Sequence, residues 1–437
     1  MKPTLKRILA GVLAVVLCAS TLTNIAGFYA EGEDPLSRIQ DSILEAEDEP
    51  SLTAADYAKR AEEEIGEQNY DAALEDLESA RSLTDPEDGT PLGALWLQSA
   101  AICYLREEYA SSREYTDRAL LCDPSSAQAY LLRAQLCLEE GNAGDAVTAL
   151  ETYVSMEPTD LSTKTYLAQL YEEAERYADA EALYEQLSSE QPEDDTHRIN
   201  ALRCAFLLGD YEKTQSGFDA YLADEAKADS EYRGLAAFLS AASAMQLGQY
   251  ASAVAKFREA ADAGYETAVC YEQMTACAFE AGEYETVIAI ADEIAQNGWQ
   301  MTDEASYRRY VGVSLLQLER FEEAVEALTK SVEADASEPE SRYYRGVALL
   351  MLERCSEAAE DFTAAIEQNY RTQYSYYNRG VCRIGTENYE GAHSDFTAAM
   401  NGSDAELAQT AGDVVQQITE YLESLKAEEQ TDEMQQR

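Results

Sequence analysis

The sequence predicts an all-α fold built from repeated pairs of helices. Residues 341–399 contain one pattern twice: with a shift of 34 residues, Gly346 aligns with Gly380 and Phe362 with Phe396. Self-similarity at a fixed period of this size is the signature of a repeat array, in which each unit packs on its neighbours. The 437 residues include only nine prolines, which favours helix, and 46% hydrophobic residues, which excludes wholesale disorder.

Ten units can be placed in phase along the chain. The residue that follows the turn inside each unit, which we number position 17, is Tyr70, Tyr109, Ala143, Tyr177, Tyr211, Tyr250, Tyr284, Phe321, Cys355 or Tyr389. Small residues recur at positions 8 and 20, where two helices press together. The residues expected to pack the repeats are Ala134, Ala146, Ala168, Ala180, Gly346, Ala358, Phe362, Gly380, Ala392 and Phe396. Three intervals exceed the period, and we expect their extra residues to lengthen a loop or the second helix.

This pattern resembles the tetratricopeptide repeat family over about residues 54–404. The resemblance implies a tetratricopeptide-type right-handed superhelical solenoid of helix-turn-helix repeats. Leu202, Thr214 and Val287 depart from the small residues of the family, so the local curvature stays open. The expected organisation is a signal peptide or signal anchor (1–30), an acidic linker (31–51), the repeat array (52–404), a C-terminal capping helix (405–429) and a frayed tail (430–437).

The N-terminus has the layout of an export signal. Lys2, Lys6 and Arg7 precede residues 8–30, which carry no charge. This run is long enough to span a bilayer, so cleavage and retention as an anchor both stay open. Cys18 would allow lipidation, although Leu17 stands where a lipobox normally has Gly or Ala. We expect the remainder to be exported, either membrane-anchored and facing outward or secreted.

The charge of the chain limits its partners. With 84 acidic and 32 basic residues the net charge is −52. Phosphate binding needs clustered positive charge, so nucleic acid and anionic membrane surfaces are excluded as partners. The acids are interpreted as a solvated outer face, or as a means of steering a basic partner or binding divalent cations, although no Asp-x-Asp-x-Asp-Gly loop is present. Membrane contact is expected only through the N-terminal segment.

No pattern in the sequence indicates an enzyme. The two histidines, His197 and His393, fall on different repeats, whereas metal catalysis gathers several ligands. Gly-rich phosphate loops, Gly-x-Ser-x-Gly elbows and HExxH motifs are absent. The eight cysteines beyond Cys18 include five at interior positions 10 and 11, which favours packing as small hydrophobes over disulfides. The expectation is a protein without catalytic residues, metal or cofactor.

The candidate binding residues follow from the resemblance, which implies that positions 2, 5, 9 and 12 of the first helix line an inner groove. Together with arginines of the same helices, these positions give Arg203, Phe206, Phe238, Arg309, Tyr343, Arg345, Tyr374, Tyr377 and Arg379. Arginine can hold a carboxylate and stack on tyrosine, so an acidic or C-terminal peptide would suit the last three repeats. The other interpretation is that these arginines pair with acids of neighbouring helices. Val313, Val347 and Val381 replace the polar residues with which some relatives hold a terminal carboxylate.

The sequence therefore predicts a non-enzymatic scaffold at the cell envelope that binds a protein or peptide in its concave groove. The alternative is a structural or self-assembling envelope element whose groove is unused.

Overall fold

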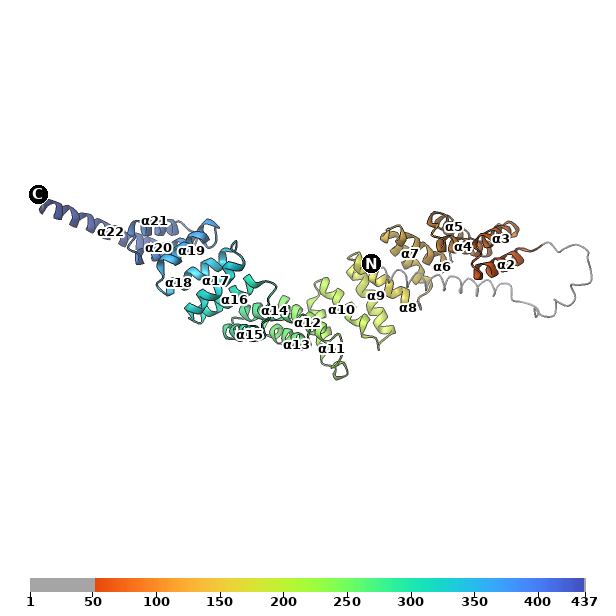
Figure 1. Cartoon of the computed structure of the whole chain (residues 1–437), viewed down its shortest axis with the longest axis horizontal. Helices are drawn as coiled ribbons and strands as arrows, with labels where there is room; N and C mark the ends of the chain where they lie inside the picture. The colour runs from red at the N-terminus through yellow and green to blue at the C-terminus, as the bar shows by residue number, and fades with distance from the viewer. Residues whose placement is uncertain (1–51, 436–437) are drawn as a thin grey trace, which may run out of the picture. The chain divides into compact units, whose positions relative to one another are not determined.

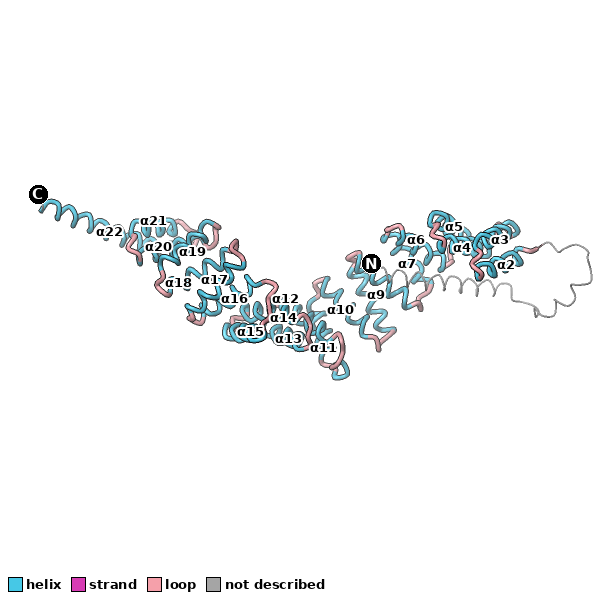
Figure 2. Tube along the Cα trace, in the orientation of Figure 1, coloured by secondary structure: helices cyan, strands magenta, loops and turns pink. Residues whose placement is uncertain are grey.

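The computed structural model describes residues 52–435, with side chains described up to residue 428. This part of the chain contains 21 α-helices, one short 3-10 helix and no strand (Figure 2). The all-α solenoid of helix-turn-helix repeats is thus confirmed. The expected signal segment (1–30) and acidic linker (31–51) lie outside the described residues.

The helices follow one another as ten pairs and a final single helix (Figure 1). The first five pairs are α2 (Ala54–Gly66) with α3 (Tyr70–Leu83), α4 (Gly89–Leu105) with α5 (Tyr109–Cys122), α6 (Ala127–Glu139) with α7 (Ala143–Met156), α8 (Leu161–Glu173) with α9 (Tyr177–Glu190), and α10 (Asp195–Leu207) with α11 (Tyr211–Leu222). The next five are α12 (Arg233–Gln246) with α13 (Tyr250–Asp262), α14 (Thr267–Glu280) with α15 (Tyr284–Asn297), α16 (Glu304–Gln317) with α17 (Phe321–Ala334), α18 (Pro339–Met351) with α19 (Cys355–Glu367), and α20 (Thr372–Gly385) with α21 (Tyr389–Met400). The last helix is α22 (Ala405–Gln435).

The turn inside each pair depends on one residue in the left-handed region, two positions before position 17. Gly141, Gly209, Gly248 and Gly282 adopt it with φ between 72° and 82°. Elsewhere a larger residue takes the same conformation, such as Glu175 at φ 56° and Glu353 at φ 57°. A side chain in this region costs about 1–2 kcal/mol, so the packing of the two helices must offset it. The turn is therefore more uniform than the glycine pattern of the sequence suggests.

The ten residues expected to pack the repeats are all buried. The reason for small residues at position 8 is visible at Gly346 and Gly380. A Cβ atom added there would lie 3.0 Å from Phe362 Cε1 and 2.9 Å from Phe396 Cε2, respectively. The phenylalanine ring of the second helix thus occupies the space that a side chain on the first helix would need.

The extra residues of the long intervals are accommodated in different ways. Between Tyr70 and Tyr109 they lengthen the first helix of the pair, since α4 has 17 residues and begins at Gly89. The prediction that only a loop or the second helix would be longer was wrong at this point. Between Tyr211 and Tyr250 they form the loop that contains the 3-10 helix Glu225–Lys227.

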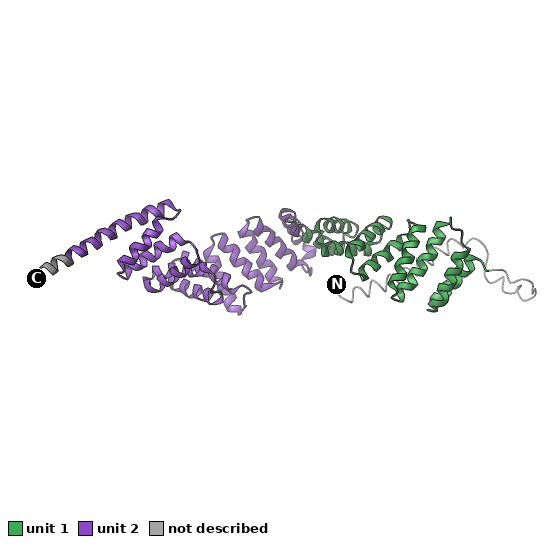
Figure 3. Cartoon of the chain, turned by 90° about the horizontal axis from the view of Figure 1, so that it is seen from above, with its two compact units in different colours: residues 1–204 green, residues 205–437 purple. Residues whose placement is uncertain are grey.

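The chain divides into two compact units, residues 1–204 and residues 205–437 (Figure 3). In the first, the largest apolar core includes Leu132, Leu150 and Tyr184. In the second, apolar clusters form around Phe257, Phe362 and Phe396.

The last helix covers the end of the second unit. Ala411 and Ile418 of α22 are buried in one cluster with Phe396, and Tyr421 lies 4.8 Å from the ring of Tyr389. The helix continues to Gln435, whereas the sequence predicted an end at residue 429. No helix among the described residues is both long and apolar enough to cross a membrane.

Candidate protein-binding face

The predicted binding tyrosines belong in part to the core of the second unit. Tyr343 is 5% exposed and packs edge-on against Phe362, with ring centroids 5.9 Å apart. Burial raises the pKa of its hydroxyl. Tyr377 packs in the same way on Phe396, at 5.2 Å. Tyr374 differs, because it is exposed and its hydroxyl donates to Asp404 at the start of α22.

The predicted residues nearest the middle of the chain are half-buried and already have partners. Phe238 lies 5.4 Å from the rings of both Phe257 and Tyr265. Within the second unit Phe206 packs on Tyr211 at 5.5 Å. In the first unit Arg203 pairs with Glu172 of α8. These contacts position the side chains and leave part of Phe206 and Phe238 accessible.

Arg345 on α18 forms a two-pronged ion pair inside its own repeat. Its Nε and Nη2 atoms donate to the two oxygens of Asp361 at 2.8 and 2.7 Å, and its Nη1 donates to Thr329 Oγ1 at 3.3 Å. Asp361 is only 3% exposed. The pair raises the pKa of Arg345, chiefly through the hydrogen bonds to Asp361. The arginine thus connects α19 with α17 of the preceding repeat.

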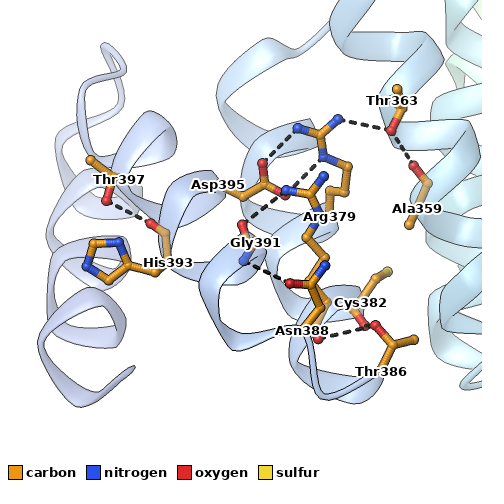
Figure 4. A network of polar contacts seen from close by, with 11 residues as sticks. Ala359, Thr363, Arg379, Cys382, Thr386, Asn388, Gly391, His393, Asp395 and Thr397 are labelled. Carbon is orange, nitrogen blue, oxygen red and sulfur yellow. Dashed lines mark hydrogen bonds and ion pairs between the residues drawn. The ribbon is translucent and has the colours of Figure 1, made fainter. Parts of the chain in front are cut away.

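Arg379 repeats this arrangement one unit later (Figure 4). Its Nε and Nη2 atoms donate to Asp395 at 2.9 and 2.7 Å, and its Nη1 donates to Thr363 Oγ1 at 2.9 Å. Arg383 lies 2.9 Å from the same carboxylate and donates to the Gly391 carbonyl. Two arginines therefore share Asp395, which is almost fully buried.

Arg309 is held by two acids of the next repeat. Its Nη1 donates to Glu340 at 2.6 Å, and its Nε lies 2.9 Å from Glu338 Oε1 without alignment for a hydrogen bond. The structure thus places Arg309, Arg345 and Arg379 against acids of the chain itself, which is the arrangement of the second interpretation. The apolar surface that stays exposed on α20 is Tyr374 and Ile384, at 39% and 36%.

We call the residues Tyr343, Tyr374, Tyr377 and Ile384 the first-helix face of the second unit, because they lie on the neighbouring first helices α18 and α20.

The first unit has a hollow of its own on the first helix α8. Thr165 and Gln169 line it together with His197 of α10. His197 is buried, its Nε2 lies 3.0 Å from Gln191 Oε1, and its Nδ1 has no hydrogen-bond partner. His393 lies on α21 in the other unit, and among the described residues no group of His, Cys, Asp and Glu side chains could hold a metal ion.

The sequence did not indicate Arg371, the residue before α20. It lies on a loop rather than on a first helix, and its φ of 39° places it in the left-handed region. The tyrosines around it, Tyr343, Tyr344 and Tyr370, come from helix α18 and from the loop before α20, which only the fold brings together.

Comparisons with known proteins agree with this architecture. Tetratricopeptide repeat profiles match residues 138–203 and residues 104–160 and 312–369. No curated protein matches the sequence. Among solved structures, the Naa15/Naa10 structure bound to HypK-THB aligns with 13% identity and a TM-score of 0.50, covering 82% of this chain and 65% of that one. This chain therefore spans less than two thirds of the length of the chain in that structure.

Two other structures align over shorter parts of the chain. A tetratricopeptide repeat protein from Parabacteroides merdae has 14% identity and a TM-score of 0.36, and covers 59% of this chain and 98% of that one. YrrB, described as a protein of this family with an unusual peptide-binding site, has 21% identity and a TM-score of 0.30, and covers 53% and 97%. With ten helix pairs in phase and profile matches in both units, the chain belongs to the tetratricopeptide repeat family.

Proposed function

We propose that the protein is a non-enzymatic scaffold that binds a segment of a partner protein on the first-helix face of its second unit. The observation that carries this proposal is the exposure of Tyr374 and Ile384 on α20, where Arg379, and Arg345 on the neighbouring α18, are already paired with acids of the chain. Aromatic and large apolar side chains supply most of the binding free energy at protein interfaces. Such exposed side chains can bind a partner protein without a metal, a cofactor or a catalytic group.

The proposed location is the outer side of the cell membrane or the space beyond it. This part of the proposal rests on the basic residues and the uncharged run of the N-terminal 30 residues. The high negative charge of the chain supports a protein partner that is neutral or basic, rather than nucleic acid.

The test is an affinity purification from envelope extracts with the full chain and two matched variants. Ile384→Glu places one acid on the first-helix face, and Leu121→Glu places one acid at an exposed apolar position of the second helix α5. We expect Ile384→Glu to lose at least tenfold of the captured partner and Leu121→Glu to retain it. Equal capture by both variants, each with an unchanged helical spectrum, would refute the proposed face.

The alternative function, self-assembly, has a distinct outcome in the same experiment. The captured protein would then be a second copy of this chain, and light scattering would show a concentration-dependent oligomer that persists at high salt.

A further inference from the structure

One arginine of the second unit lies among three tyrosine rings without an acidic partner. The guanidinium carbon of Arg371 is 5.6 Å from the ring centroid of Tyr343, 5.8 Å from that of Tyr344 and 6.0 Å from that of Tyr370. The guanidinium also hydrogen-bonds to the Tyr370 hydroxyl, which raises the pKa of Arg371, and an arginine held among aromatic rings in this way has five donors to share. The Arg371 side chain itself is exposed, so these donors are accessible.

Arg371 lacks an acidic partner although acidic residues outnumber basic ones in this chain by 84 to 32. Across residues 52–428, whose side chains are described, no carboxylate lies within ion-pair distance of Arg371, whereas Arg309, Arg345 and Arg379 all have one. Three acids of the adjoining segments are engaged elsewhere. Glu338 and Glu340 pair with Arg309, and Asp404 accepts a hydrogen bond from the hydroxyl of Tyr374. A carboxylate of a partner could therefore pair with the Arg371 guanidinium, which has no ion pair within the chain.

The backbone adds to this preference for an anion. Arg371 is the N-cap residue of the 14-residue helix α20, and its side chain makes no capping hydrogen bond. The N-terminus of a helix carries partial positive charge, which stabilises a nearby anion.

The corresponding loop three repeats earlier, before α14, shows that the loop does not require the arginine. Glu266 precedes α14 with the same φ of 39°, and Tyr265 stands where Tyr370 stands before Arg371. The ring of Tyr265 packs on Phe238 as Tyr370 packs on Tyr343. The same loop conformation thus accepts an acidic residue, so the backbone does not require arginine at residue 371.

We propose that Arg371, together with Tyr343, Tyr344 and Tyr370, forms a receptor for the side-chain carboxylate of one Asp or Glu in the partner segment. The inference rests on the proposed function, and it adds the chemistry of the partner. Arg371 directly precedes α20, the helix that carries Tyr374 and Tyr377, so a carboxylate side chain of a segment on the first-helix face lies within reach of it. The strong negative charge of the scaffold requires the remainder of that segment to be neutral or basic.

Two pools of nine-residue peptides test this inference on the full chain. Both pools are acetylated and amidated and are randomised over uncharged residues, with a central Asp in one pool and Asn in the other. Binders from affinity selection are measured by fluorescence anisotropy with their Asp/Asn counterparts. We expect the Asp peptides to bind at least about tenfold more tightly, because a charge-assisted pair contributes that much or more.

Two variants decide whether Arg371 is responsible. Arg371→Gln should abolish the preference for Asp. Arg354→Gln should retain it, because Arg354 is an exposed arginine that pairs with Glu357. Residue 371 tolerates glutamine, since the equivalent loop carries glutamate at residue 266.

Each contrary outcome would refute a different part of this inference. If selected peptides bind equally with Asp and Asn, or if the preference survives Arg371→Gln, the carboxylate receptor is refuted while the proposed binding face stands. If a free C-terminal acid on the Asn pool restores binding through Arg371, the assignment to a side chain is wrong. If neither pool yields a binder, recognition of linear segments fails and the inference fails with it.

Discussion

The arginines at position 7 suggested a binding site, but in the structure they connect neighbouring repeats. Each contacts the residue at position 23 of its own repeat and the residue at position 25 of the preceding repeat. In two successive units an arginine at position 7 holds an aspartate at position 23 and a threonine at position 25 of the preceding unit. The same positions carry the opposite arrangement earlier in the chain. There Lys256 at position 23 donates to Asp219 at 2.6 Å and to Ser240 at 2.8 Å. The geometry thus allows a polar contact between repeats at these positions, and the identity of the charged partner can be exchanged. Other units have buried apolar residues at position 7, such as Met274 and Val311.

The buried end of such a pair should contribute to stability. Asp395→Ala leaves Arg379 and Arg383 without their shared acceptor, so we expect a loss of about 2–3 kcal/mol in the free energy of unfolding. Urea unfolding followed by far-UV circular dichroism measures it. The matched control is Glu357→Ala, which removes an exposed partner of Arg354 and should leave the midpoint unchanged. An equal effect of the two substitutions would show that the position 7 pair is not structural.

A second prediction concerns the glycine at position 8 of α16. A Cβ atom at Gly312 would lie 2.5 Å from Leu328 Cγ, which is a branch point with little freedom to move. The clash costs up to about 3 kcal/mol and the gain in helix propensity is about 1 kcal/mol, so Gly312→Ala should destabilise by up to about 2 kcal/mol.

The control for this prediction is Gly412→Ala in α22, where the nearest atom is Met400 Sδ at 3.4 Å. It should stabilise by about 0.5–1 kcal/mol, because the propensity gain meets no clash. The same urea experiment compares the two, and stabilisation by Gly312→Ala would contradict the packing described for α16 and α17.

At the scale of the elements, the sequence determined the helices well because each boundary has a local cause. The residue at position 17 begins the second helix in every pair, from Tyr70 to Tyr389. The longer α4 was not predicted, because the length of an interval between repeats does not determine which helix or loop is longer. Left-handed turns at Glu175 and Glu353 were hidden as well, because glutamate carries no turn signal.

The candidate site was predictable only in part. Periodicity identified Tyr374 and Tyr377 as first-helix residues, and the structure shows that Tyr374 is exposed while Tyr377 packs on Phe396. Partners of the arginines could not be read from the sequence, since any of many acids might have faced them. Arg371 was missed because two of the rings around it come from α18, a helix of the preceding repeat.

The cap of the array yields a prediction for a whole element. Truncating the chain after residue 404 removes Ala411 and Ile418 and exposes Phe396, so we expect aggregation and faster hydrogen exchange in α20 and α21. Truncation after residue 428 should have no such effect, because Ala411 and Ile418 are retained. Exchange in α20 and α21 that is equal in both truncated chains would show that α22 is not a structural cap.

At the scale of the whole molecule, stability should fall at alkaline pH. Burial raises the pKa of Cys204, Cys277 and Cys382 to about 12 each. In the unfolded chain these thiols lose their protons at about pH 8.5, so the unfolded state binds fewer protons above that pH. Their contribution to stability is complete below about pH 8.5 and is lost as the pH rises toward 12.

Urea midpoints between about pH 8 and 11 measure this effect. The three-fold variant Cys204→Ala, Cys277→Ala and Cys382→Ala should show a flatter decline than the natural chain, whatever its midpoint at neutral pH. A decline of the same steepness would assign the alkaline loss to other groups.

The function proposed for the whole molecule depends on which surface meets the partner. Site-specific photo-crosslinking in living cells addresses this directly, with benzoylphenylalanine at residue 384 on the first-helix face and, separately, at residue 121 on α5. Both natural side chains are exposed and apolar, so neither replacement disturbs the core. We expect a partner adduct from residue 384 and none from residue 121. Adducts from residue 121 alone would contradict the account.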